Sequence, residues 1–324
     1  MNVNQQPSIL LIWPSFAQLS ELVETGLRQY AGAKVRTIHF DVAPYAFCQY
    51  ANVGQRIENL FLKHCYKRNL KKIQPIQKIL QELKNSHCYF DLIIVNRADM
   101  LDSHYLGKLK NHATHIIAHH WDSMHMCPLL NGHKKIFDRI YSFDKEDCAS
   151  HNFRFLPNFF VPTETVSSQG TGTYCIMGLD SARVKLLEQI ASQLEAIGQT
   201  YQFLGFGDFP SPYITRLNST RPYPQVLKDI ESSFAILDLK RGKWSGLSFR
   251  CFEALGMHKK LITDNTSIES YDFFNPNNIW VLRDGVPITQ DFFQTPYQPV
   301  PEDIKNQYSL KAWARELTSI THQP

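Results

Sequence analysis

The chain has 324 residues, which is long enough for two domains of ordinary size and too long for one small domain. Hydrophobic residues make up 43% and charged residues 20%, so the chain can form a proper core and does not belong to the disordered class. The 34 lysines and arginines exceed the 30 aspartates and glutamates by only 4, which is too little for a dedicated nucleic-acid binder.

The seven cysteines are scattered along the chain without any CxxC pair. This usage is typical of a reducing compartment, where cysteines serve as small hydrophobic residues. The first residues lack the apolar core of a signal peptide, and the apolar run that follows them is far too short to span a membrane. We therefore expect a cytoplasmic protein that is soluble or peripheral at the inner face of the plasma membrane.

Short apolar runs alternate with helical stretches along the first half of the chain. Apolar runs of this length are expected as strands of a parallel sheet, which is covered on both faces. In chain order we expect a strand at 9–13, a helix at 16–30, a strand at 35–40, a helical region at 55–84, a strand at 91–95, a helix at 101–111, a strand at 115–118, and extended segments at 139–143 and 153–160.

The helical region 55–84 is strongly basic. It holds eight lysines and arginines against two glutamates, Glu58 and Glu82, and its apolar residues recur at roughly helical spacing. One interpretation is a basic amphipathic surface that rests on an anionic membrane or an anionic acceptor. The other is a pair of helices with a solvated lysine face. The sequence leaves both open.

A polar passage at 163–173 contains almost no large apolar residue and is interpreted as an interdomain linker. Beyond it the alternation restarts. We expect strands at 174–177, 201–204, 234–239, 261–263 and 279–282, helices at 184–197, 224–232 and 246–255, and a terminal helix within 301–320.

Strands separated by helices predict parallel sheets covered on both faces. The predicted fold class is therefore α/β, with two domains at 1–165 and 166–300 followed by a terminal helix at 301–324. Ligands of such open sheets bind at the carboxyl ends of the strands, and a cleft between two such domains would collect them.

The segment from Lys240 to Gly256 carries the most specific chemistry. Ser245 and Gly246, at the expected start of a helix, offer free backbone amides and the positive end of the helix dipole to a phosphate. Arg250 lies one turn further and can supply a forked cation to the same anion. Glu253 stands in an otherwise apolar helix and needs donors as partners, which a ribose diol would supply. The alternative is a capped helix in which Glu253 simply pairs with Arg250.

This segment also carries a resemblance to a known family. Ser245–Gly256, together with Lys259–Thr263 and Tyr271–Ile279, is similar to the C-terminal block of bacterial GT-B-type glycosyltransferases of lipopolysaccharide and capsule synthesis. A weaker similarity runs through Trp121–Ser123, Tyr141–Asp147 and Phe155–Pro157.

The resemblance implies a GT-B fold, in which two Rossmann-like domains face each other across a cleft. It places an acceptor on the domain 1–165, a nucleotide sugar on the domain 166–300, and the terminal helix of 301–324 back on the first domain. It also implies no essential metal and no other cofactor, because backbone amides and basic side chains neutralise the leaving diphosphate.

The resulting hypothesis is transfer of a hexose-like sugar from a nucleotide-sugar donor to a hydroxyl of a growing, lipid-linked surface glycan, as in lipooligosaccharide, capsule or exopolysaccharide. Lys240, Arg241 and Lys243, on the loop before the helix, are expected to close over the diphosphate. Ser245 stands where many retaining enzymes of this type have a second glutamate, so the stereochemical outcome stays open. The alternatives are a sugar-nucleotide epimerase or hydrolase on the same fold, and a non-catalytic subunit of a polysaccharide assembly complex.

An inverting transferase needs a general base near the acceptor hydroxyl. Asp122 is the first candidate, because it follows the strand 115–118 and neighbours Trp121, an aromatic ring on which a sugar can stack. His120 and His119 are the alternatives, since imidazole titrates near working pH. Equally, Asp122 could cap the next turn and the histidines could be packing residues. The histidines and the cysteine between 115 and 133 have spacings that match no familiar zinc ligand set.

Overall fold

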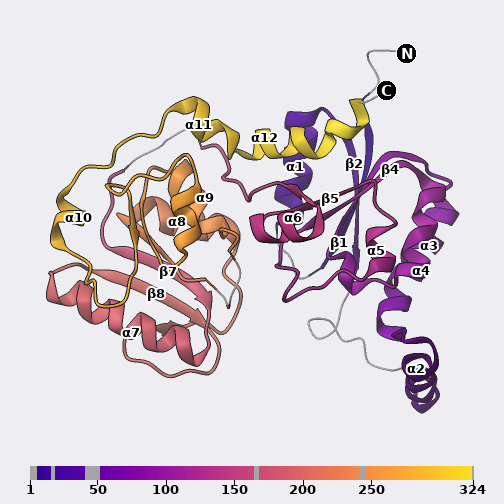
Figure 1. Cartoon of the computed structure of the whole chain (residues 1–324), viewed down its shortest axis with the longest axis horizontal. Coiled ribbons are helices and arrows are strands. Elements are labelled where there is room, and N and C mark those ends of the chain that lie inside the picture. The colour runs from indigo at the N-terminus through magenta and orange to yellow at the C-terminus, as the bar shows by residue number, and fades with distance from the viewer. Residues whose placement is uncertain are drawn as a thin grey trace. The chain divides into compact units, whose positions relative to one another are not determined.

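The computed structural model describes residues 6–15, 19–40, 52–163, 168–240, 242 and 245–322. The chain forms two compact units (Figure 1). Unit 1 comprises Met1–Leu156 and Ala314–Pro324, and unit 2 comprises Pro157–Trp313. The boundary between the two units lies after Leu156. The domain boundary expected from the sequence lies nine residues further on, after residue 165.

Unit 1 is built on a six-stranded sheet in the order β2-β1-β3-β4-β5-β6, and every neighbouring pair in it is parallel. In chain order its elements before residue 157 are β1 (Ser8–Pro14), α1 (Ser20–Ala31), β2 (Lys34–Phe40), α2 (Val53–Tyr66), α3 (Leu70–Ser86), β3 (Phe90–Asn96), η1 (Ala98–Met100), α4 (Ser103–Leu106), η2 (Gly107–His112), β4 (Ala113–His120), α5 (Asn131–Lys134), β5 (Arg139–Ser142), α6 (Lys145–His151) and β6 (Arg154–Phe155).

Unit 2 holds a second six-stranded parallel sheet, in the order β12-β11-β10-β7-β8-β9. Its elements are β7 (Thr173–Gly178), α7 (Ser181–Ala196), β8 (Tyr201–Phe206), β9 (Thr215–Arg216), α8 (Tyr223–Ser232), β10 (Ala235–Asp238), α9 (Phe249–Gly256), β11 (Lys260–Thr263), η3 (Thr266–Ser270), β12 (Ile279–Val281), α10 (Gln290–Gln294), α11 (Glu302–Gln307) and the first part of α12 (Leu310–Thr318). The predicted α/β class with two parallel sheets is confirmed.

The central strands of both sheets, which the sequence predicted, are buried on both faces. In β1 the run from Ile9 to Trp13 is fully buried, because β2 and β3 flank it in the sheet and helices cover its faces. The predicted strand at 234–239 is β10, whose four residues are likewise buried. The short edge strand β9 carries two exposed residues and left no apolar signal to predict it.

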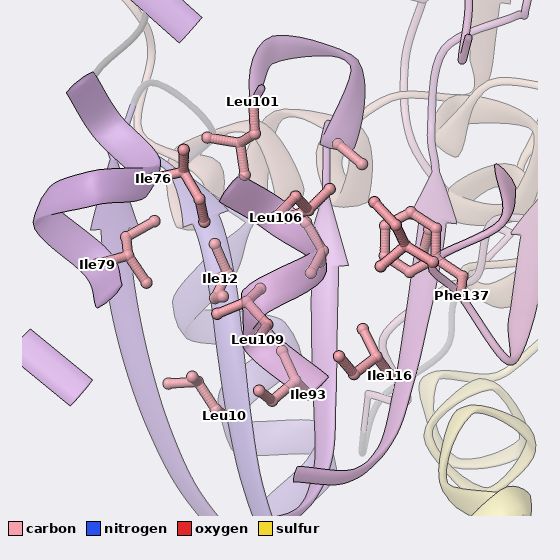
Figure 2. Close-up of a cluster of buried hydrophobic side chains, with 14 of the residues drawn as sticks. Leu10, Ile12, Ile76, Ile79, Ile93, Leu101, Leu106, Leu109, Ile116 and Phe137 are labelled. Carbon is pink, nitrogen blue, oxygen red and sulfur yellow. The ribbon is translucent and has the colours of Figure 1, made fainter. Parts of the chain in front are cut away.

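The basic region 55–84 forms two helices with opposite surroundings. In α3 the apolar residues Ile73, Ile76, Ile79 and Leu83 are buried, and Figure 2 shows Ile76 and Ile79 directed at the side chains of the sheet. In α2 only Asn59 is buried. Although the two helices have similar amphipathic patterns, the apolar residues of α3 pack in the core, whereas those of α2 face solvent.

Three predicted elements differ from the observed ones. The helix expected at 101–111 is split into the short α4 and the 3₁₀ helix η2. The helix expected from Gly246 begins at Phe249 instead, because the side chain of Ser248 caps it. In the extended segment 153–160, only Arg154 and Phe155 pair with a neighbouring strand of the sheet.

The last residues of the chain belong to unit 1. The end of α12 and the 3₁₀ helix η4 (Ser319–His322) contact the outer strands β5 and β6. Arg139 of β5 donates to the hydroxyl of Ser319 at 2.9 Å, and the hydroxyl of Tyr141 donates to Glu316. Among the described helices none is long and apolar enough to cross a bilayer.

We expect Leu10→Ala to lower the free energy of unfolding by about 2–5 kcal/mol, because Leu10 is fully buried in β1 and the substitution leaves a cavity. The matched variant Leu60→Ala, at a residue 68% exposed on α2, should change it by less than about 0.5 kcal/mol. Urea-induced unfolding followed by circular dichroism measures both. Equal losses in the two variants would show that the apolar face of α2 is packed in solution.

Candidate functional site

The strand order of unit 2 changes direction at β7. This strand pairs with β8 on one side and with β10 on the other, so the chain runs outward from it first in one direction and then in the other. Parallel sheets open a crevice beyond the carboxyl ends of the strands at such a point. A pocket of about 200 Å³ lies there, lined by the last residues of β7 and by Asp238, Leu239 and Lys240 at the end of β10.

Basic side chains dominate the polar part of this pocket. Arg183, in the first turn of α7, donates to the carbonyls of Gly178 at 2.7 Å and Leu239 at 2.9 Å, and so ties the ends of β7 and β10 together. Lys240 is anchored through its backbone N–H, which donates to the carboxylate of Asp264 at 2.7 Å. Arg250 also lines the pocket, and its buried Nε has no hydrogen-bond partner within the described residues. The pocket therefore suits an anion.

The loop before α9 is fixed by side-chain hydrogen bonds. Asn265 donates to the carbonyls of Ser245 at 3.3 Å and Gly246 at 3.1 Å. Ser248 accepts from the N–H of Arg250 and donates to Asp238 at 2.8 Å. The first free amides of the helix thus follow Ser248, and the prediction that Ser245 and Gly246 begin the helix is wrong.

Glu253 lies inside the protein, beside Arg250 on the same helix. It is buried and does not belong to the pocket wall, and its Oε2 has no hydrogen-bond partner in the described part of the chain. Burial raises the pKa of Glu253, while the guanidinium of Arg250 and the hydroxyl of Tyr223 oppose that rise. Of the residues predicted for donor binding, Lys240, Gly246 and Arg250 thus line one pocket. Arg241 and Lys243 lie outside the described residues.

Unit 1 has a change of direction of its own, since β1 pairs with both β2 and β3. Arg97 follows β3 with a left-handed backbone (φ 56°), a conformation that costs energy in a residue other than glycine. Its guanidinium donates to both carboxylate oxygens of Asp99, from Nε at 2.9 Å and from Nη2 at 3.0 Å. Its Nη1 donates to the carboxylate of Asp122 at 3.0 Å.

Asp122, the predicted base, therefore stands at the carboxyl edge of the first sheet in an ion pair with Arg97, with 35% of its side chain exposed. Arg97 was not among the site residues predicted from the sequence. The signal that could have found it is its place two residues after the apolar run Leu92–Val95, where ligand-binding side chains of parallel sheets gather.

The histidines beside Asp122 are neutral packing groups. His119 and His120 are each 1% exposed, and the Nε2 of His120 donates to the carbonyl of Cys127 at 2.7 Å. The rings of Trp13 and His119 both meet Trp121 edge to face, with centroids 4.5 and 5.2 Å away. Burial lowers the pKa of His119 to about 3, and it also lowers the pKa of His120. Only Asp122 of the three predicted bases is open to solvent.

The described residues hold no group of three or more His, Cys, Asp or Glu side chains that could bind a metal ion. His133, a member of the histidine-rich stretch, donates through Nε2 to the carbonyl of Leu101, 2.9 Å away. Because a carbonyl only accepts, Nε2 must carry the proton, and this histidine serves to hold the chain.

Neither a scan of protein-family models nor a search of curated proteins finds a match to this chain. Solved structures do match over nearly its whole length. They include a glycosyltransferase from Rickettsia africae (11% identity, 98% of each chain, TM-score 0.57) and AviGT4, a glycosyltransferase involved in avilamycin A biosynthesis (10% identity, 98% of this chain and 97% of that one, TM-score 0.56).

A third structure, a UDP-N-acetylglucosamine 2-epimerase described as putative, from Listeria monocytogenes, matches at 8% identity, with 99% of this chain and 98% of that one covered and a TM-score of 0.56. At such identities the likeness concerns the fold alone. The chain has the GT-B fold, as the resemblance in its C-terminal block predicts.

We expect His119→Gln to make the protein less sensitive to acid. Unfolded histidine gains a proton below about pH 6.5, whereas His119 in the folded protein stays neutral down to about pH 3, so the wild-type protein loses stability as the pH falls through this window. Between about pH 7.5 and pH 5.5 this residue costs the wild type about 1.4 kcal/mol, which the variant should not lose. Urea unfolding at both pH values measures the difference, and equal losses would show that His119 is accessible to protons.

Proposed function

We propose that the protein is a glycosyltransferase that moves a sugar from a nucleoside-diphosphate donor, bound in unit 2, to a hydroxyl of an acceptor bound in unit 1. The observation that carries this proposal is the pocket at the ends of β7 and β10, where Arg183, Lys240 and Arg250 meet. Three cations in one small pocket at the change of strand direction suit a diphosphate.

In the reaction, the bond between the sugar and the diphosphate breaks and negative charge grows on the departing phosphate. Arg250 is half-buried in the pocket wall, where a fixed cation partly shielded from water stabilises this charge more than it would in solvent. Glu253, buried beside Arg250 on the same helix, acts on the donor through its electrostatic interaction with that guanidinium. Gly246, which also lines the pocket, its neighbour Ser245, and the basic residues Arg241 and Lys243 of the same loop complete the proposed binding loop. No metal is required in this scheme.

Asp122 is the proposed general base. As the acceptor oxygen forms its bond to the anomeric carbon, the carboxylate takes the proton of that hydroxyl, and the reaction inverts the anomeric centre. Arg97 holds one oxygen of Asp122 at 3.0 Å and thereby orients the other toward the acceptor. The stacking surface for the acceptor sugar is Trp121, whose ring packs on Trp13.

The acceptor that we propose is a lipid-linked glycan of the bacterial surface, such as lipooligosaccharide, capsule or exopolysaccharide. Support comes from the C-terminal block Ser245–Gly256 with its continuation to Ile279, which resembles enzymes of those pathways. A sugar-nucleotide epimerase is the second candidate, favoured by the structural match to the Listeria monocytogenes protein of that name. It would act on the same donor without an acceptor.

We expect one nucleoside diphosphate out of UDP, GDP, ADP, CDP and dTDP to raise the thermal midpoint of the protein, with or without EDTA. At a hundred times its dissociation constant a ligand stabilises the folded state by about 2.7 kcal/mol. Arg250→Gln should abolish most of this shift, while Arg216→Gln, at an exposed arginine of the same unit, should leave it unchanged. If none of the nucleotides stabilises the protein, the pocket is not a donor site.

We expect Asp122→Asn to slow sugar transfer by about 10²–10⁴-fold, because the amide cannot take a proton, while nucleotide stabilisation stays intact. The assay follows release of nucleoside diphosphate from the matching nucleotide sugar, with and without a lipooligosaccharide extract as acceptor. Asp208→Asn, at a carboxylate 86% exposed in unit 2, is the control. Release of nucleoside diphosphate that needs no acceptor and survives Asp122→Asn would favour a hydrolase over the transferase.

A further inference from the structure

Helix α2 presents an apolar face to solvent. Val53, Ile57, Leu60 and Phe61 are 69%, 63%, 68% and 57% exposed, and their spacing puts them on one side of the helix. Scattered exposed apolar residues are ordinary, but four large ones along one helical face form a continuous patch. In Figure 1 this helix projects from the rest of unit 1, beyond α3 and α4.

The other side of α2 fixes the direction of this face. Asn59, the buried residue of the helix, accepts from the backbone N–H of Leu70 at 2.8 Å and so joins α2 to the start of α3. Asn52 caps the first turn of α2 by accepting from the N–H of Gln55 at 3.0 Å. Because Asn59 attaches α2 from the side opposite to Ile57 and Leu60, the apolar residues face outward.

The charge around this face is positive. Arg56, Lys63 and Lys67 are exposed along α2 and its C-terminal cap, and the acidic residue of this helix is Glu58. Arg56 and Lys63, seven positions apart, lie on one flank of the apolar stripe. A helix with bulky apolar residues on one side and basic residues beside them is typical of an element that lies in the headgroup region of an anionic bilayer.

Hydrogen bonds and ion pairs connect the C-terminal end of α2 with the segment of unit 1 that holds Asp122. Arg68, just after α2, forms a forked pair with Asp102 at 2.6 and 2.8 Å. Lys72 donates to the carbonyl of Asp99 at 2.6 Å. The carboxylate of Asp99 in turn holds Arg97, the partner of Asp122. The apolar helix and the proposed base thus belong to the same edge of the first sheet.

We propose that α2 docks unit 1 on an anionic lipid bilayer, with Ile57, Leu60 and Phe61 inserted below the headgroups and Lys63 and Lys67 on the lipid phosphates. For the acceptor this means a lipid-anchored glycan that reaches Asp122 from the membrane surface. That consequence rests on the proposed transferase, whereas the docking itself rests on α2 alone.

The test is co-sedimentation of the full chain with vesicles of phosphatidylcholine, alone or mixed with phosphatidylglycerol. The wild type should bind the anionic vesicles at least tenfold more tightly than the neutral ones, and salt should weaken this binding. The triple variant Ile57→Ser, Leu60→Ser, Phe61→Ser should lose at least tenfold in binding. The double variant Phe209→Ser, Val286→Ser, at exposed apolar residues of unit 2, is the matched control and should bind like the wild type.

A second measurement reports insertion directly. Phe61→Trp places a fluorophore on the apolar face, and its emission should shift to the blue and be quenched by brominated lipids when anionic vesicles are added. Failure of the wild type to bind vesicles, or unchanged binding by the triple variant, overturns the proposal. A wild-type dimer that the triple variant converts to monomer, without vesicle binding, assigns the face to a second copy of the chain and equally overturns it.

The same preparations separate this proposal from the proposed function. Nucleotide stabilisation depends on the pocket of unit 2, so the triple variant should retain it in full. Vesicle binding without any nucleotide effect would leave the membrane proposal standing and remove the transferase. Nucleotide stabilisation without vesicle binding would do the reverse.

Discussion

The pairing of β7 with both β8 and β10 is the constraint on which the site in unit 2 depends. Because the chain leaves β7 toward one edge of the sheet and returns to begin β10 on its other side, the connections that follow the two strands diverge and leave a crevice. Arg183 lies in that crevice and donates to the carbonyls of Gly178, at the end of β7, and Leu239, just after β10. The position of the pocket follows from this feature of strand order, and Arg183, Lys240 and Arg250 supply its positive charge.

The same constraint operates in unit 1 with different chemistry. Here the residue after β3 is Arg97, held in a left-handed conformation that its two carboxylate partners stabilise. A strained cation between Asp99 and Asp122 keeps a carboxylate oriented at the edge of the sheet, whereas the pocket of unit 2 gathers cations. One unit is thus equipped to hold an anion, and the other presents an oriented carboxylate.

The sequence predicted the two sheets well because their central strands carry apolar residues on both faces, as in Ile9–Trp13 and Leu92–Val95. It could not decide whether Ser245 or Ser248 begins α9, since a serine can cap a helix at either position. The choice depends on Asp238, ten residues earlier in the chain, whose carboxylate accepts a hydrogen bond from the hydroxyl of Ser248. Nor could it separate α2 from α3, whose amphipathic patterns are alike, because burial depends on what packs against each helix. The ion pair of Asp122 with Arg97 was equally out of reach, since it joins residues that follow different strands.

The route of the chain has a consequence for biosynthesis. Residues 314–322 bind to β5 and β6 of unit 1 through Arg139 and Tyr141, yet they are synthesised after the whole of unit 2. Because domains begin to fold as they leave the ribosome, unit 2 has all its own residues available first. Unit 1 must wait, with the outer part of its sheet uncovered, until the last turn of α12 emerges. The first unit to be made is therefore the last to be finished.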